Sequence, residues 1–77
     1  MNHFYEISQR IKKIISQQHS KQKIFDKDIA IALGLEPQYY AVIKRREKIP
    51  YHAIAQFCQK NKICMNWVLF GQKPTYI

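Results

Sequence analysis

The chain has 77 residues, of which 47% are hydrophobic and 23% charged. This balance describes one small folded domain with a single core and argues against a disordered tail. Thirteen Lys and Arg residues against five Asp and Glu residues give a formal net charge of +8. That excess favours an anionic partner such as nucleic acid or a membrane surface, and basicity alone does not choose between them.

Residues that could act as metal ligands, redox groups or catalysts are few and scattered. Cys58 and Cys64 stand six apart without a CxxC pair or a histidine pair at zinc-finger spacing, so the sequence predicts no metal site or redox motif. A disulfide between them stays open, although a reducing cytoplasm favours two free thiols. No histidine, serine or carboxylate stands at a spacing that indicates an active site, and the two glycines provide no phosphate-cradling loop. We therefore expect no enzyme, no cofactor and no metal.

The N-terminal segment is amphipathic and admits two interpretations. Over residues 2–18, apolar side chains at helical spacing share one stripe, formed by Phe4, Ile7, Ile11, Ile14 and Ile15. The opposite face is polar and basic, as in helices that lie on a membrane surface. Packing against later helices explains the same stripe, and we favour a core helix. No stretch approaches the roughly 18 apolar residues of a membrane span, and no signal peptide opens the chain, so we expect a cytoplasmic protein without a membrane partner.

The central stretch, residues 26–47 (DKDIAIALGLEPQYYAVIKRRE), predicts two short helices joined by a tight turn. Asp26 is placed to cap the first helix by accepting hydrogen bonds from its free N–H groups. Apolar residues four apart share the face that this helix must bury, namely Phe25, Ile29 and Leu33. Gly34 follows where a chain that leaves a helix favours positive φ, so it ends the first helix.

The second helix of this pair begins near Glu36. Leu35 is apolar enough to fill the inside of the turn, and Pro37, which has no N–H to lose, suits the first helical turn. Tyr40 and Ile43 are three apart and are placed to pack inward. The side chains left on the outside are Gln38, Tyr39, Ala41, Val42, Lys44, Arg45 and Arg46.

The outward side chains suit a helix in the DNA major groove, with its N-terminal residues at base edges. Gln38 has an amide that can bond bidentately to adenine, and Arg45 is the candidate for guanine. Ala41 and Val42 offer apolar contact to a thymine methyl group. The predicted base-reading set comprises Glu36, Pro37, Gln38, Tyr39, Ala41, Val42 and Arg45.

Basic residues on both sides of the recognition stretch predict contacts to DNA phosphates, which raise affinity whatever the base sequence. The predicted phosphate set comprises Lys21, Lys23, Lys27, Lys44, Arg46 and Lys48. Two plainer interpretations compete with it. Cations near a helix C-terminus are favoured by the helix dipole alone, and the lysines that precede Asp28 equally suit solubility. Asp26 and Asp28 are repelled by phosphate and count against tight backbone contact at that point.

Beyond the basic cluster, the sequence predicts two more helices and an apolar tail. Pro50 starts the first of them, and its inward stripe consists of Ala53, Ile54, Phe57 and Cys58. Asn66 is placed to cap a last short helix over residues 67–70, which Gly71 ends. The tail, residues 72–77, either frays or docks on a neighbouring chain.

These segments predict an all-α fold, a small bundle of about five helices in a single domain, residues 1–77. The domain contains a helix-turn-helix at residues 26–47 and ends in a short tail. So short a chain buries a modest fraction of its surface, and a dimer partner would supply extra burial.

Residues 26–71 resemble the N-terminal DNA-binding domain of phage CI-type repressors, in the lambda-repressor-like helix-turn-helix group. The shared features are an LA-x-x-LG-like core before the turn, an I-P step after the basic cluster and a D-W-L-L-x-G-like close. They correspond here to Ile29, Ala30, Leu33, Gly34, Ile49, Pro50, Asn66, Trp67, Val68, Leu69 and Gly71. This combination is more specific than the helix-turn-helix pattern alone.

The resemblance implies binding to a double-stranded DNA operator, as a homodimer, to repress transcription. By position in the family's motif, the groove-facing places are Glu36, Pro37, Gln38, Ala41, Val42 and Arg45. Tyr40 stands where a smaller aliphatic residue is common, and Ile43 where tryptophan is frequent. These departures imply a different angle of the recognition helix. Glu36 is unfavourable toward phosphate unless it accepts a hydrogen bond from a cytosine amino group.

A function from a second class stays open, because fold does not fix function. In this alternative the helical domain is a protein–protein interaction module without specific DNA binding, and its contact surface comprises Tyr39, Tyr40 and the apolar tail. We favour the DNA-binding regulator, since it accounts for the outward side chains of residues 36–46.

Overall fold

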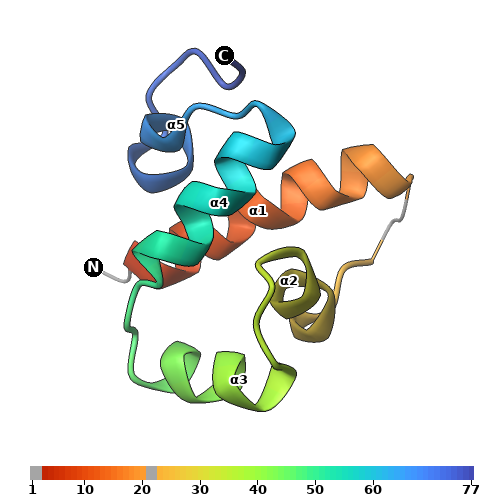
Figure 1. Ribbon diagram of the computed structural model, residues 1–77, viewed down its shortest axis with the longest axis vertical. Helices are drawn as coiled ribbons and strands as arrows, with labels where there is room; N and C mark the ends of the chain where they lie inside the picture. The colour runs from red at the N-terminus through yellow and green to blue at the C-terminus, as the bar shows by residue number, and fades with distance from the viewer. Residues whose placement is uncertain (1–2, 21–22) are drawn as a thin grey trace.

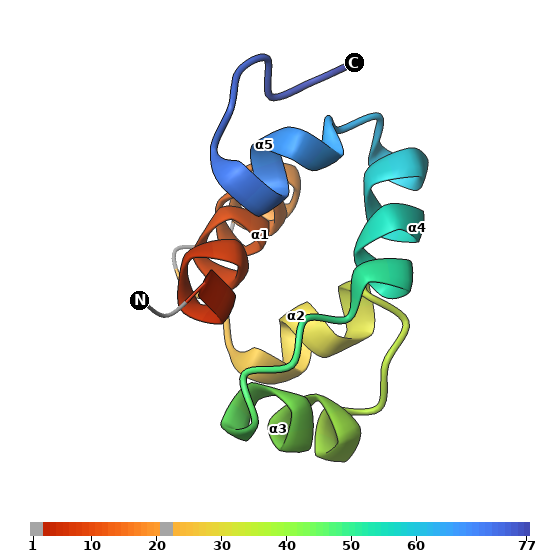
Figure 2. The same ribbon diagram turned by 90° about the vertical axis from the view of Figure 1, so that its left-hand side faces the viewer.

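Five helices form in the described part of the chain because apolar residues recur at helical spacing along it. The structure, a computed structural model, describes residues 3–20 and 23–77. The helices are α1 (His3–His19), α2 (Asp26–Ala32), α3 (Pro37–Arg45), α4 (Tyr51–Asn61) and α5 (Met65–Phe70). Figures 1 and 2 show α3 at one end of the molecule and α5 with the C-terminal tail at the opposite end. The predicted all-α class with about five helices is confirmed.

One cluster of buried apolar side chains holds the helices together. The predicted stripe of α1 is entirely buried, and none of its members is more than 6% exposed. Ile29 and Ala30 of α2, Ile54 of α4 and Ile63 after α4 have no exposed surface. The apolar stripe of α1 therefore packs in the core of the protein itself, as the favoured interpretation predicted.

Each of the four later helices ends in a turn or a left-handed residue, and backbone N–H groups there donate hydrogen bonds to the last carbonyl groups of the helix. Gly34 adopts a positive φ value of 73° after α2, as predicted, and Gly71, which ends α5, adopts a φ value of 75°. Glu47 and Lys62 adopt φ values of 54° and 55° after α3 and α4, although each carries a Cβ atom. Such a conformation costs a non-glycine residue about 1 kcal/mol, and backbone hydrogen bonds across both turns offset that cost.

The start of α2 differs from the prediction for a local reason. Phe25 is the extended residue before the helix, and its N–H donates to the Asp28 carboxylate at 2.9 Å. Asp26 is therefore the first residue of α2 and does not cap it. Because Phe25 lies outside the helix, helical spacing does not apply to it, and its side chain is 50% exposed instead of buried.

The start of α5 also differs, because the chain becomes helical earlier than predicted, at Met65. The carbonyl of Cys64 accepts hydrogen bonds from the N–H groups of Trp67 and Val68 at 3.0 and 3.3 Å. Asn66 therefore lies inside α5 and is not its cap.

The C-terminal tail returns to its own chain. The N–H of Cys64 donates to the carbonyl of Thr75 at 2.8 Å, and the N–H of Ile77 donates to the carbonyl of Lys62 at 2.9 Å. The Tyr76 hydroxyl lies 3.1 Å from the side-chain oxygen of Gln17 in α1. These bonds hold the tail against α1 and the α4–α5 connection, so it is not frayed.

Candidate nucleic-acid interface

The tight turn between α2 and α3 is built as the sequence predicts. The N–H of Leu35 donates to the carbonyl of Ala30 at 2.8 Å, and the N–H of Gly34 donates to that of Ile31 at 3.0 Å. Leu35 is half-buried against the core. The two helices also pack against each other, so residues 26–45 form one unit, which we call the α2–α3 unit.

Two buried side chains determine which face of α3 points outward. Glu36 is the extended residue before the helix and Pro37 is its first residue, as predicted. Tyr40 and Ile43 are only 2% and 3% exposed. The ring of Tyr40 packs against that of Phe4 in α1, with the ring centroids 5.8 Å apart. The opposite side of α3 must therefore face solvent.

The predicted base-reading residues all lie on α3 or immediately before it. The exposed members are Glu36, Pro37, Gln38, Tyr39, Ala41 and Arg45, and the half-buried member is Val42. Amide, phenol, methyl and guanidinium groups thus share a face that the core does not use. Figure 2 shows α3 along the outer edge of the molecule, so a large partner can reach this face.

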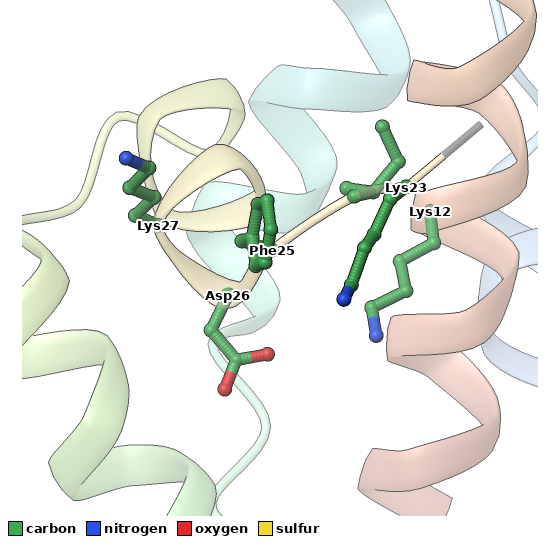
Figure 3. Close-up of a pocket in the computed structure, with 6 residues that line it drawn as sticks. Lys12, Lys23, Phe25, Asp26 and Lys27 are labelled. Carbon is green, nitrogen blue, oxygen red and sulfur yellow. The ribbon is translucent and has the colours of Figure 1, made fainter. Parts of the chain in front are cut away.

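The predicted phosphate contacts fall into two groups. The first surrounds the C-terminal end of α3, where the exposed members are Lys44, Arg46 and Lys48. The second lies at the start of α2, where Lys23 and Lys27 are exposed. Figure 3 shows that Lys27 points away from Lys23, so these two lysines are not directed at the same phosphate. Lys21 lies outside the described residues.

An ion pair connects the two groups. The Nζ of Lys44 lies 2.6 Å from the carboxylate of Asp26, and the two side chains are 50% and 47% exposed. Water screens a pair of this kind, so it stabilises the fold by at most about 1 kcal/mol. The pair nevertheless places a negative charge between two basic groups and occupies one predicted phosphate contact. Its partners stand 18 residues apart in sequence, beyond any helical spacing, so no local pattern signals it.

Tyr40 carries a buried hydroxyl to which no described residue makes a hydrogen bond. Burial, and secondarily the negative charge of Asp26, raise the pKa of Tyr40 to about 12. The hydroxyl therefore stays neutral at physiological pH. Because the side chain is almost fully buried, Tyr40 cannot take part in a contact surface. This corrects the predicted protein-interaction surface, from which only Tyr39 and the tail remain accessible.

The described residues hold no cluster of metal-ligating side chains. Among residues 3–20 and 23–77, no three His, Cys, Asp or Glu side chains gather as a metal site requires. Cys58 and Cys64 are both free. Burial, and secondarily the nearby Cys64, raise the pKa of the Cys58 thiol, which keeps it in the unreactive protonated form.

Comparison of the chain with protein-family models, curated proteins and solved structures finds no match. The resemblance to CI-type repressors therefore stays a prediction, carried by the residues quoted for it. None of the helices in the described residues reaches the length and apolarity that a bilayer crossing requires. Fold and site together define a small all-α protein in which α3 presents an exposed, polar and basic face at one end.

Proposed function

We propose that the protein is a sequence-specific, double-stranded DNA-binding regulator of transcription, and that it represses. In this proposal the α2–α3 unit is a helix-turn-helix and α3 is the recognition helix. The observation that supports it is the orientation of α3, whose two buried side chains turn Gln38, Ala41 and Arg45 outward together.

The dimensions and chemistry of α3 suit the major groove. A helix of nine residues is about 14 Å long, and the groove is about 12 Å wide and accepts one α-helix. Gln38 lies in the first turn, where recognition helices contact base edges, and is assigned to adenine. Arg45, in the last turn, is assigned to guanine, and Ala41 between them to a thymine methyl group.

The charge distribution supports a duplex partner in particular. Lys44, Arg46 and Lys48 follow the recognition face at its C-terminal end, and Lys23 precedes α2. The ion pair between Lys44 and Asp26 brings the two groups together, so both can contact the phosphates of one strand that borders the groove and release counterions there. An isolated basic helix end would lack the second group.

A homodimer completes the proposal. Figures 1 and 2 place α5 and the tail opposite α3, so a second copy can pack there without covering the recognition face. Phe70 and Ile77 at that end are 66% and 86% exposed. Two symmetric copies would read half-sites about one helical turn, roughly 34 Å, apart. Sedimentation at high protein concentration without DNA tests this, and a monomer there would contradict the dimer.

The experiment that tests the proposed function selects bound duplexes from a random DNA pool. The best sequence and a scrambled control are then titrated across a series of salt concentrations. We expect a palindromic sequence bound at least about a thousandfold tighter than the control. Equal and steeply salt-dependent binding to both would show that net charge acts alone, and would favour the alternative of a protein–protein interaction module with Tyr39 on its surface.

A further inference from the structure

An open pocket of about 680 Å³ lies between α1 and the start of α2 (Figure 3), lined by Lys12, Lys23, Ile24, Phe25, Asp26 and Lys27. A second hollow of about 470 Å³ continues along α1, lined by Gln9, Lys12, Lys13, Ser16, Lys23 and Ile24. Lys12 and Lys23 line both hollows, so the two form one polar track. We call it the α1–α2 track.

Two lysines from different elements converge in this track. Figure 3 shows the ammonium groups of Lys12 and Lys23 directed into the same space, while Lys27 points away. The Nζ of Lys23 lies 5.3 Å from the centroid of the Phe25 ring, within cation–π distance. The exposed ring of Phe25 thus holds Lys23 beside Lys12. Convergence of two like charges is unfavourable unless an anion lies between them.

The track contains too little negative charge to balance these lysines. Asp26 is the one carboxylate among the residues that line either hollow, and it is already paired with Lys44 at 2.6 Å. Among the described residues, neither Lys12 nor Lys23 has a carboxylate partner within ion-pair distance. The counter-charge must therefore come from solvent or from a ligand.

We propose that the α1–α2 track binds backbone phosphates of a nucleic acid, with Lys12 and Lys23 as the contacts and Phe25 as the positioning residue for Lys23. The lining of the second hollow runs from Gln9 to Ser16, about two turns of α1, and this length favours a polyanion over a single free anion. Through Asp26 and Lys44 the track adjoins the C-terminal cations of α3, so one backbone strand can contact both. The inference rests on the proposed function and adds the polar and basic face of α1 to the DNA-facing surface.

The test measures DNA affinity across a salt series for Lys12→Gln, Lys23→Gln and the double variant, on the selected duplex. Each lost phosphate contact makes the negative slope of log K against log salt shallower by about 0.9. At about 0.1 M salt, this corresponds to a fivefold to tenfold weaker affinity for each single variant. Lys60→Gln is the matched control, because it removes one exposed lysine in the last turn of α4, and it should leave affinity and slope unchanged.

The role of Phe25 has a separate readout. Phe25→Leu removes the ring beneath Lys23 and should weaken binding about twofold, whereas Phe25→Tyr keeps a ring and should restore affinity. In a Lys23→Gln background, Phe25→Leu should have no further effect. Equal losses in both backgrounds would overturn the positioning role.

The outcomes separate the track from the proposed function. Tight duplex binding with unchanged affinity and slope in Lys12→Gln and Lys23→Gln would overturn the track and leave the recognition helix standing. If the wild type binds no duplex, the proposed function fails, and amide NMR shifts then test the track with a short single-stranded oligonucleotide and with pyrophosphate. Shifts with the oligonucleotide that the double variant abolishes support the track. Shifts with pyrophosphate alone, or with neither, overturn its assignment to nucleic acid.

Discussion

Two basic regions of the molecule differ in how the chain builds them. The cluster around the end of α3 lies in one stretch of sequence, residues 44–48, which holds four exposed cations and Glu47. The α1–α2 track instead brings Lys12 of α1 beside Lys23 of the connection to α2. Contiguous cations at a helix C-terminus are also explained by the helix dipole. Cations that converge from two elements have no such local explanation and therefore indicate a ligand more strongly.

Asp26 lies between these two regions and touches both. Asp26 lines the pocket of the α1–α2 track, and its carboxylate pairs with Lys44 of the α3 cluster. Variants on each side of this residue, and at the residue itself, therefore test whether the regions act as one surface.

The largest effect is expected from reversing the charge of the α3 cluster with Lys44→Glu, Arg45→Glu and Arg46→Glu together. The change alters the net charge by six and places carboxylates against phosphate, so duplex affinity should fall by at least about a thousandfold at 0.1 M salt. Circular dichroism should show an intact fold, since all three side chains are exposed.

The matched control for the triple reversal is Lys60→Glu, Lys62→Glu and Lys73→Glu, three exposed lysines toward the α5 end. It makes the same change of net charge away from α3 and should weaken binding far less. Similar losses in the two triple variants would show that overall charge, and not the α3 cluster, governs affinity.

A smaller effect should distinguish base readers from phosphate contacts within the α3 region. Gln38→Ala and Arg45→Ala should each cost about 1 to 3 kcal/mol at one or two base pairs and relax preference there. Arg46→Ala should weaken binding to all sequences alike. Competition titrations with single-base variants of the selected site measure this, and uniform weakening by all three changes would remove the base-reading assignments.

Replacement of Asp26 should strengthen binding modestly. Asp26→Asn frees Lys44 and removes the negative charge between the two regions, so duplex affinity should rise about threefold to tenfold with a steeper salt dependence. Stability should fall by no more than about 1 kcal/mol, because the ion pair is half exposed. Glu6→Gln, which removes an exposed carboxylate elsewhere on α1, is the control. An equal gain in both variants would mean that only net charge matters.

The smallest effect on binding is expected from Tyr40→Phe, which changes the core behind the recognition face. Removal of a buried hydroxyl without a partner should raise the free energy of unfolding by about 1 kcal/mol and leave DNA affinity unchanged. A loss of stability would show that the hydroxyl is hydrogen-bonded in solution.

Tyr40 also predicts a pH dependence. Its pKa rises from 10.0 to about 12 in the folded protein, so the unfolded state loses this proton first as pH increases. The contribution of Tyr40 to the free energy of unfolding is therefore fully present below pH 10 and is lost between pH 10 and about 12. Unfolding by denaturant at pH 8 and pH 11 should therefore show a larger loss of stability for the wild type than for Tyr40→Phe, by about 1 kcal/mol.

Much of the fold could be predicted because it depends on neighbours within a helix or turn. Spacing alone identified the buried stripe of α1 and the inward pair of Tyr40 and Ile43. Gly34 and Pro37 marked the turn between α2 and α3 correctly. The errors fell at helix starts, where the predicted caps Asp26 and Asn66 lie one and two residues after the observed ones, Phe25 and Cys64. At α2 the Asp28 carboxylate accepts a hydrogen bond from the Phe25 N–H, and this bond makes Asp26 the first helical residue.

The candidate interface, like the fold, could be predicted from the sequence only in part. By itself the sequence determined the five helices and the outward face of α3, because helical periodicity and turn chemistry are local. Only the tertiary structure decided that Asp26 pairs with Lys44, that Lys12 meets Lys23 beside Phe25, and that the tail returns to α1. These contacts join separate elements, and their charge interactions depend on distances that no local pattern encodes.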